Sequence, residues 1–393
     1  MKLCDLKLLY VCTDFPWPPI SGGRVDMWNR IQALYSLGII FDVVATVREQ
    51  PLATERARVE SLVRRLIFSK RRRTFHGFFS SKPGQTAVRS DLRNVSLDDE
   101  YDVVLMQTEF ASEILFNKKL RYSTSIIRVD NDECRFYKQT AKAERSFLLK
   151  LFFYQEAFRI KIASLRVLRS VDALWFVSYD ELRRYRQQPR LNAGQTMAFV
   201  PSALDFTLLN QPSLDGTSVL FVGNLWASLN REALEWYIAN VHPRLSQIAG
   251  YEFVIVGSTR GQGCDWIGDL TRPYINIKLH FDAEDLTPFF QSSAVFVNPM
   301  QQGAGVKLKT MEAILRGLPV VSTTRGAEGS GLVAGEHYQH ADAPEAFAQR
   351  IQQLLADKQM AHALVQRAQA FVSDHYNQVA VLEKLLLAIA SPD

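Results

Sequence analysis

The sequence predicts two successive doubly wound α/β domains, and three observations support this fold. Short apolar runs alternate with amphipathic helical segments along most of the chain, which is typical of parallel sheets covered by helices. The alternation restarts after a stretch rich in proline, glycine, serine and aspartate at residues 208–218. The length of 393 residues exceeds one ordinary core and suits two domains.

The first half opens with a strand-helix-strand unit. Residues 7–15 form an apolar run, 25–38 carry apolar residues at helical spacing up to a glycine, and 41–47 resume as a strand. A proline-rich loop containing Gly22 and Gly23 joins the first strand to the helix. Further buried strands are predicted at 101–109, 123–131, 173–178 and 196–202.

The second half repeats this order. Strands are predicted at 219–225, 252–258, 275–281, 294–300 and 318–324, with helices at 230–248 and 283–293. The predicted organisation is an N-terminal domain at 1–205, a linker at 206–216, a C-terminal domain at 217–376, and a final helix at 377–393 that is expected to pack back on the first domain.

Composition and charge exclude several classes of protein. A net charge of +5 is too mild to indicate a nucleic-acid partner. The four cysteines form no CxxC pair, which favours a reducing compartment over a disulfide scaffold or a zinc site. Neither a secretion signal nor an uncharged run of about 18 apolar residues is apparent, so we expect a cytoplasmic protein, with the inner face of the membrane as an alternative location.

The segment GAGVKLKTMEAILRGLPVVST at 303–323 is the most informative motif, because it follows a predicted strand and opens a helix. If the helix begins near Gly305, then Gly305, Lys309 and Glu312 share one face at about 100° per residue. Backbone amides at the helix start would bind a diphosphate, and the carboxylate about 10 Å further along would accept bonds from ribose hydroxyls. The alternative is an ordinary surface pair between Lys309 and Glu312.

At this point the chain resembles a known family. The segment GAGVKLKTMEAILRGLPVVSTTRGAEG, with VLFVGNLWASLNREALEWY and FVIVGS before it, resembles the donor-nucleotide domain of retaining GT-B glycosyltransferases of the family 4 kind. DFPWPPISGGR, DNDECRFY and VDALWFVSYDE resemble the acceptor domain of the same family more loosely. The resemblance implies a GT-B fold, with two Rossmann-like domains facing each other across a cleft. It also implies transfer of a sugar from a nucleoside diphosphate sugar to a hydroxyl, with retention of configuration.

The resemblance also implies roles for individual residues. The glutamate at Glu312 would bind the ribose, while Gly22 and Gly23 would approach the donor from the acceptor domain. The remaining predicted donor-nucleotide ligands are Gly223, Asn224, Asn230, Arg231, Gly305, Val306, Lys307 and Lys309.

Three positions depart from the family pattern. Ala304 replaces a glutamate that usually contacts the transferred sugar, and Asn224 and Asn230 stand where an arginine and a lysine usually bind the diphosphate. Because negative charge develops on the leaving phosphate, a cation is expected nearby. Lys309 is the first candidate for this catalytic role, followed by Lys307 and Arg231.

A proton acceptor for the acceptor hydroxyl is harder to assign. Asp130 and Asp132 end a predicted strand, and either a catalytic role or a role in capping explains them. Asp130 is the predicted catalytic residue, while Asp132, Glu109 and Glu328 are placed on the acceptor side of the cleft. No cofactor or metal is expected, since the histidines lack ligand spacing and no DxD-like motif lies where a metal-dependent transferase would carry one. A UDP-sugar is the predicted co-substrate.

The expected acceptor is a hydroxyl group of a glycan, of a lipid-linked molecule or of a protein. Two stretches, 63–79 and 145–169, mix basic and bulky apolar residues, so each is either a solvated face over the core or a peripheral membrane contact. A sugar-nucleotide epimerase or hydrolase and a catalytically silent nucleotide-sugar-binding protein remain alternative functions. A nicotinamide oxidoreductase is disfavoured, because the first glycine loop lacks GxGxxG.

Overall fold

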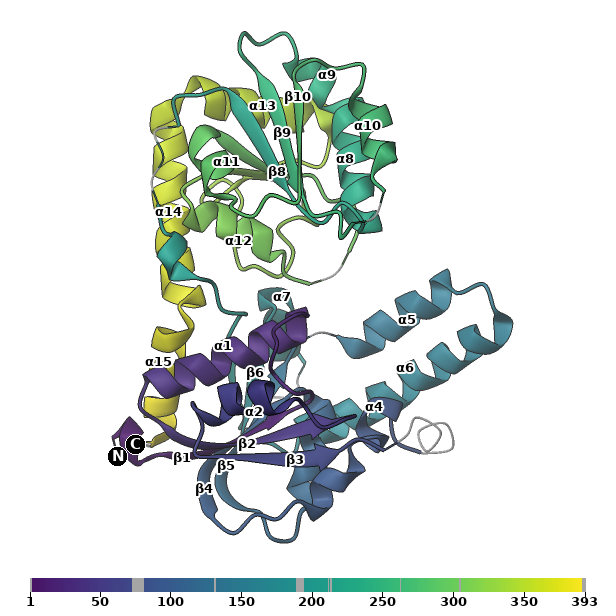
Figure 1. The fold of residues 1–393 in the computed structure, drawn as a ribbon, viewed down its shortest axis with the longest axis vertical. Coiled ribbons are helices and arrows are strands. Elements are labelled where there is room, and N and C mark those ends of the chain that lie inside the picture. Colours follow the sequence, from purple (N-terminus) through teal and green to yellow (C-terminus); the bar gives the residue numbers. More distant parts are fainter. Residues whose placement is uncertain are drawn as a thin grey trace. The chain divides into compact units, whose positions relative to one another are not determined.

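The chain forms two compact units, each built on one parallel sheet (Figure 1). The structure is a computed structural model that describes residues 2–72, 81–130, 132–188, 194–210, 212, 214–261, 263–303 and 305–390. Unit 1 comprises Met1–Ala203 and Gln378–Asp393, and unit 2 comprises Leu204–Asn377. The predicted fold class, two Rossmann-like doubly wound domains, is confirmed.

Unit 1 contains a seven-stranded sheet in the order β3-β2-β1-β4-β5-β6-β7. Its strands are β1 (Lys7–Cys12), β2 (Ile40–Val47), β3 (Arg65–Lys70), β4 (Glu100–Gln107), β5 (Arg121–Val129), β6 (Ala173–Phe176) and β7 (Thr196–Phe199). Its helices include α1 (Gly22–Ser36), α2 (Ala53–Glu60), α4 (Gly84–Ala87), α5 (Glu133–Ala143), α6 (Phe147–Leu168) and α7 (Tyr179–Arg186), with the 3-10 helix η3 at Glu109–Phe116. The central strands are buried on both faces, which explains their continuous apolar runs.

The strand β3 lies in the first of the two basic, apolar stretches. Of residues 63–79, which we expect to form a solvated face over the core or a peripheral membrane contact, 65–70 form an edge strand paired with β2. The guanidinium groups of Arg64 and Arg65 both bind the buried carboxylate of Asp42 and the carboxylate of Asp99. These cations are therefore engaged within unit 1. Residues 73–79 of that stretch lie outside the described residues.

Unit 2 contains a six-stranded sheet in the order β10-β9-β8-β11-β12-β13. Its strands are β8 (Ser218–Val222), β9 (Glu252–Gly257), β10 (Ile277–Phe281), β11 (Val295–Asn298), β12 (Val320–Ser322) and β13 (Gln339–His340). Its helices are α8 (Ser228–Asn240), α9 (His242–Leu245), α10 (Asp265–Thr271), α11 (Thr287–Ser292), α12 (Leu308–Leu315), α13 (Pro344–Ala356) and α14 (Lys358–Tyr376), as far as the described residues show. Because β8 and β11 are neighbours, the loops that follow them meet at one edge of the sheet.

The helix predicted at 230–248 is divided in the structure. It ends at Asn240, and the short helix α9 begins at His242 with a proline, Pro243, at its start. A proline has no N–H to continue the hydrogen bonding of the preceding helix, which accounts for the break.

The last helix, α15 (Gln378–Ala390), belongs to unit 1, although unit 2 precedes it in the sequence. It lies beside α1 (Figure 1), and Leu382 and Leu386 are fully buried in the same cluster as Met27 and Ile31 of α1. The final helix therefore completes the core of the first unit. Among the described residues, no helix combines the length and the apolar character needed to cross a bilayer.

Replacing Leu382 by alanine should lower the free energy of unfolding of unit 1 by about 2–5 kcal/mol, because the substitution leaves a cavity in a closed core. The matched control is Leu387→Ala on the same helix, where the side chain is 41% exposed and the expected change is below about 0.5 kcal/mol. Urea unfolding of both variants measures the difference. Equal midpoints would show that α15 does not contribute to this core.

Candidate functional site

At the carboxyl edge of the unit 2 sheet, the loops after β8 and β11 are joined by hydrogen bonds through the first turns of the helices that follow them, α8 and α12. The Lys309 Nζ donates to Asn230 Oδ1 at 2.9 Å, and the Asn230 Nδ2 donates to the carbonyl oxygen of Asn224 at 3.0 Å. A Cβ added to Gly223 would lie 3.0 Å from the Asn230 amide nitrogen, so the chain passes close to that side chain. The structure therefore brings together four of the predicted donor-site residues.

Lys309 is the central cation of this group. Its side chain is half-buried, and its Nζ lies 4.3 Å from the centre of the Phe221 ring on β8. Burial, followed by the neighbouring charge of Lys307, lowers the pKa of Lys309 to about 7. An anion bound at this position would favour the protonated form and raise that pKa.

The glycine loop before α12 differs from the predicted helix start. The helix begins at Leu308, with Lys307 as its N-cap, so the expectation that Gly305 lies on the helix is wrong. Gly303 and Gly305 have φ values of 103° and 82°, which keep the backbone in a loop conformation that only glycine adopts without strain. Val306 lies in the same loop and is half-buried. Residue 304, where alanine replaces the family glutamate, lies outside the described residues.

Lys307 closes this loop on itself. Its Nζ donates to the carbonyl oxygen of Gly305 at 2.6 Å, and burial lowers its pKa, although the carboxylate of Glu328 acts in the opposite direction. Glu328 also accepts a hydrogen bond from Arg325 at 2.9 Å. Glu328 therefore lies close enough to the loop to influence its charge.

Glu312 does not pair with Lys309. Its Oε1 accepts a hydrogen bond from Arg316 one turn later, at 3.0 Å, and its side chain remains 31% exposed. The Arg316 guanidinium also contacts Thr287 and the Phe290 ring. The alternative of a Lys309–Glu312 surface pair is therefore wrong, because the Glu312 carboxylate pairs with Arg316 instead. The partial exposure of Glu312 leaves its carboxylate accessible to a ligand.

Arg231 follows Asn230 on α8, but its side chain bonds to a residue of the same helix. Its Nε donates to Glu235 at 2.8 Å, its guanidinium carbon lies 5.0 Å from the Trp266 ring centre, and its side chain is about half exposed. The structure thus assigns the cation at the junction of the loops to Lys309.

Three residues that sequence reasoning missed support the loop from below. The Asn298 Nδ2 donates to Thr310 Oγ1 at 2.7 Å and to the Gly326 carbonyl oxygen at 2.9 Å, and all of these contacts are buried. They connect the end of β11 to α12 and to the loop after β12. The signal in the sequence was a polar residue, Asn298, at the end of an apolar strand. Its partner Thr310 is 12 residues away, and sequence spacing alone does not identify that contact.

The carboxyl edge of the unit 1 sheet carries a buried ionic cluster. Arg128 binds Asp26 through two hydrogen bonds of 2.7 and 2.8 Å, and its Nε lies 3.2 Å from Asp130. The amide of Gln107 donates to both carboxylates. Burial raises the pKa of Asp130 to about 6, whereas Arg128 and Arg30 outweigh burial at Asp26 and hold its pKa below the usual value.

Glu109 and Asp132 have different surroundings. Glu109 is buried, accepts a hydrogen bond from Ser164 at 3.0 Å, and has a pKa that burial raises to about 7. Asp132 accepts a hydrogen bond from the Arg135 amide and caps α5, so the capping interpretation accounts for its position. Gly22 and Gly23 open α1, and no atom lies within 4 Å of a Cβ placed on either, which leaves space above this turn.

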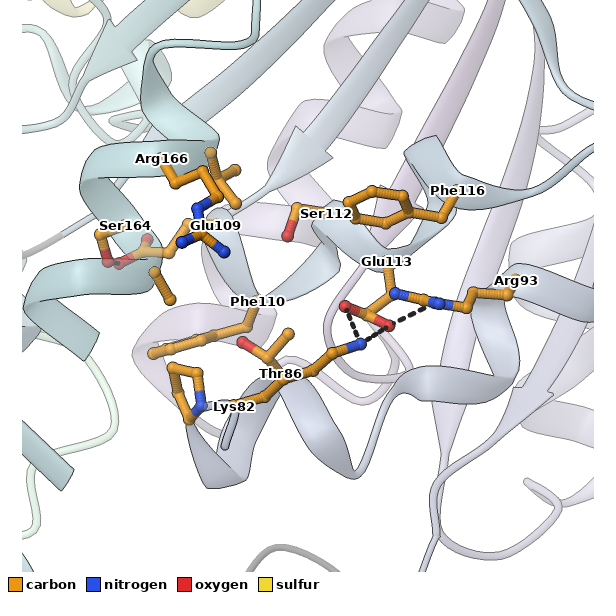
Figure 2. A pocket seen from close by; sticks show the side chains of 13 residues that line it. Lys82, Thr86, Arg93, Glu109, Phe110, Ser112, Glu113, Phe116, Ser164 and Arg166 are labelled. Atoms are coloured by element: carbon orange, nitrogen blue, oxygen red, sulfur yellow. Dashed lines mark hydrogen bonds and ion pairs between the residues drawn. The ribbon is translucent and has the colours of Figure 1, made fainter. Parts of the chain in front are cut away.

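A cavity of about 250 Å³ lies between η3 and α6 of unit 1. Figure 2 shows Glu109 and Ser164 on one side and Glu113 between Lys82 and Arg93 on the other. The Glu113 carboxylate accepts hydrogen bonds of 2.8 and 2.7 Å from these two cations. Within the described parts of both units, no group of three or more His, Cys, Asp or Glu side chains is placed to bind a metal ion. A metal-free reaction stays a prediction.

The fold and the loops of unit 2 agree with comparisons to known proteins. Residues 216–357 match the family model of the glycosyl transferases group 1. This region covers most of unit 2, including both joined loops, so unit 2 is similar to the group 1 glycosyl transferases.

Similar proteins extend the comparison to the whole chain. An uncharacterised 44.6 kDa protein from the cps region of Klebsiella pneumoniae is 29% identical over 388 residues, which cover 96% of this chain and 98% of that protein. Sucrose-phosphate synthase from Thermosynechococcus elongatus has a similar structure, with a TM-score of 0.64, 15% identity and coverage of 98% and 100% of the two chains. HepE from Anabaena, solved in complex with UDP and glucose, has a TM-score of 0.60 and 12% sequence identity, and the match covers 98% of this chain and 99% of that chain. The fold is therefore the two-domain GT-B fold.

The lowered pKa of Lys309 predicts a pH dependence of stability. Between a pKa of about 7 in the folded protein and the ordinary value of 10.5, the unfolded chain binds one proton more at this lysine. Stability should therefore rise as the pH rises from about 7 to 9, and this rise should be absent from Lys309→Met. Urea unfolding midpoints at pH 7, 8 and 9 test it, with the exposed Lys278→Met as the control. Parallel curves for wild type and Lys309→Met would contradict the lowered pKa.

Proposed function

We propose that the protein transfers a sugar from a UDP-sugar to a hydroxyl acceptor, with retention of configuration, in the assembly of a polysaccharide or glycoconjugate. The observation that carries this proposal is the junction of the two loops of unit 2 at Lys309 and Asn230, within the region that matches the group 1 glycosyltransferases. The relative from a cps region and the neighbour that binds UDP and glucose support the substrate class.

In the proposed reaction, unit 2 holds the donor. The backbone amides around Gly305, Val306 and Lys307 bind the diphosphate, while Glu312 accepts hydrogen bonds from the ribose hydroxyls. Lys309 lies where a phosphate held by the two loops would meet a cation. Departure of UDP places negative charge on the β-phosphate, so a cation whose position is set by packing lowers the barrier of this step.

Unit 1 supplies the acceptor side. We propose that Asp130 accepts the proton of the attacking hydroxyl, because its pKa of about 6 makes it a carboxylate at neutral pH that still has appreciable basicity. Gln107 and Arg128 fix the orientation of that carboxylate. The reaction as proposed uses no metal, and the cation on the leaving group is Lys309.

Thermal shift and UDP release across a panel of nucleoside diphosphate sugars test the proposed function. A donor that binds the folded protein raises its melting temperature according to its concentration and affinity. We expect a UDP-sugar to stabilise the protein and to release UDP in the presence of a glycan acceptor. Product analysis separates transfer from epimerisation or hydrolysis. Stabilisation without UDP release would indicate a silent binding protein, and the absence of both would overturn the proposal.

Lys309→Met should lower turnover by roughly 100-fold at saturating donor, because the substitution keeps the apolar stem and removes the charge where it develops. Calorimetry of UDP binding at pH 8 gives a second measurement. The wild type should take up nearly one proton on binding, since the anion raises the pKa of Lys309 from about 7, and the variant should take up none.

Two further variants make this result specific. Lys278→Met, on the edge strand β10, should keep both turnover and proton uptake. Asn224→Arg in the Lys309→Met background returns a cation to the position that the family usually uses, and it should recover part of the lost turnover. Near-wild-type turnover of Lys309→Met would exclude Lys309 as the cation.

Glu312→Ala should weaken UDP binding by about 1.5–3 kcal/mol, the usual contribution of hydrogen bonds to a charged group. The matched control is Glu235→Ala, which breaks a similar pair with an arginine one turn away, at 2.8 Å on α8. Calorimetry should show normal affinity for the control. Unchanged affinity of Glu312→Ala would remove Glu312 from the nucleotide site.

A further inference from the structure

The helices α5 and α6 form a hairpin that extends away from the sheet of unit 1 (Figure 1). Large apolar side chains are exposed along α6. Phe147 is 76% exposed and Leu148 is 77% exposed, at the start of the helix. The other exposed apolar residues of α6 are Leu149, Leu151, Tyr154, Phe158 and Ile162. Isolated exposed apolar residues are common, but a row of them on one helix marks an interaction surface.

These side chains share one face of the helix. Leu148, Leu151, Phe158 and Ile162 follow one another at intervals of three, seven and four residues, which keep to one side of a helix, so they form a stripe along about four turns. Phe147 lies next to this stripe by the same geometry. The stripe does not pack on the core of unit 1, since the buried residues of α6 are Glu156, Ala157, Ile160 and Leu168.

Cations lie beside the stripe and at its two ends. At about 100° per residue, Lys150 and Lys161 lie along one border, Arg166 continues the line of Leu148 at the end of the helix and lines the cavity of unit 1, and Arg145 lies just before the helix. None of these four forms an ion pair with another residue of the described chain. Glu156 is the acidic residue of α6, and it is 2% exposed and accepts a hydrogen bond from the Gly84 amide. The exposed face therefore carries positive charge that no carboxylate of the same helix neutralises.

We propose that this face of α6, named here the α6 stripe (Phe147, Leu148, Leu151, Phe158 and Ile162 with Lys150 and Lys161), binds peripherally to an anionic lipid bilayer. An apolar stripe flanked by lysines and arginines lies parallel to a membrane surface, with the apolar side chains among the acyl chains and the cations among the phosphates. This inference does not depend on the proposed enzymatic activity.

A second copy of the chain is a weaker occupant of the α6 stripe. Packing two such faces together would place one set of lysines near the other, with no exposed carboxylate of α6 between them. An anionic lipid surface instead supplies the negative charge that the borders lack. Charge complementarity thus favours the bilayer.

Sedimentation with lipid vesicles tests the proposal on the full-length protein. One vesicle is pure phosphatidylcholine, and the other is a two-to-one mixture of phosphatidylcholine and phosphatidylglycerol. We expect binding to the mixed vesicles at low salt and much weaker binding to the neutral ones. The double variant Leu148→Glu/Leu151→Glu should bind the mixed vesicles at least about 10-fold more weakly. The control Ile275→Glu, at a 93% exposed apolar residue of unit 2, should bind normally.

A second variant separates charge from apolar insertion. Lys150→Gln/Lys161→Gln should weaken binding to the mixed vesicles by roughly fivefold per lysine, and it should reduce the salt dependence of binding. Thermal unfolding should be unchanged in each variant, because the substituted side chains point to solvent. Equal binding of wild type to both vesicles, or to neither, would overturn the proposal. A dimer in solution that Leu148→Glu dissociates, without vesicle binding, would assign the α6 stripe to a second copy instead.

Discussion

One hydrogen bond, from Lys309 to Asn230, joins the first turns of α12 and α8, the helices that follow the carboxyl ends of β11 and β8. The sheet makes this bond possible, because β8 and β11 are paired neighbours although their last residues, Val222 and Asn298, are 76 positions apart in the sequence. The Phe221 ring beneath the amine determines where the charge lies. A lysine side chain that packing already holds in place loses little conformational entropy when a ligand binds. A cation preorganised in this way stabilises developing negative charge most effectively.

Unit 1 also holds charged side chains in fixed positions, in the buried cluster around Arg128. Asp26 and Asp130 share the neighbours Gln107 and Arg128, yet their pKa values move in opposite directions. The paired carboxylate is held ionised, and the other is brought closer to neutrality. Two acids with different protonation behaviour are a frequent basis for proton transfer, and here the difference arises from which of them receives the bidentate arginine.

Much of the fold was predictable, because apolar runs and helical periodicity are local properties of the sequence. The parallel strands of both sheets other than β3 and β13, and the position of the glycine loop before α12, belong to this part. The start of α12 was not predictable, since Gly303 and Gly305 adopt positive φ values that delay the helix to Leu308. The pairing of Glu312 was also ambiguous, because Lys309 and Arg316 are both within one turn of it, and tertiary contacts of Arg316 decide the outcome. Strand β3 was obscured by arginines whose partners, Asp42 and Asp99, are remote in the sequence.

The position of α15 has a consequence for the synthesis of the chain. Unit 2 is one continuous segment, Leu204–Asn377, whereas unit 1 requires the last residues of the sequence to fill its core. During translation, unit 2 is complete before the ribosome has released the helix that unit 1 awaits. The domain made second can therefore fold to completion first, while the earlier domain keeps an apolar groove over α1 open until α15 has left the ribosome.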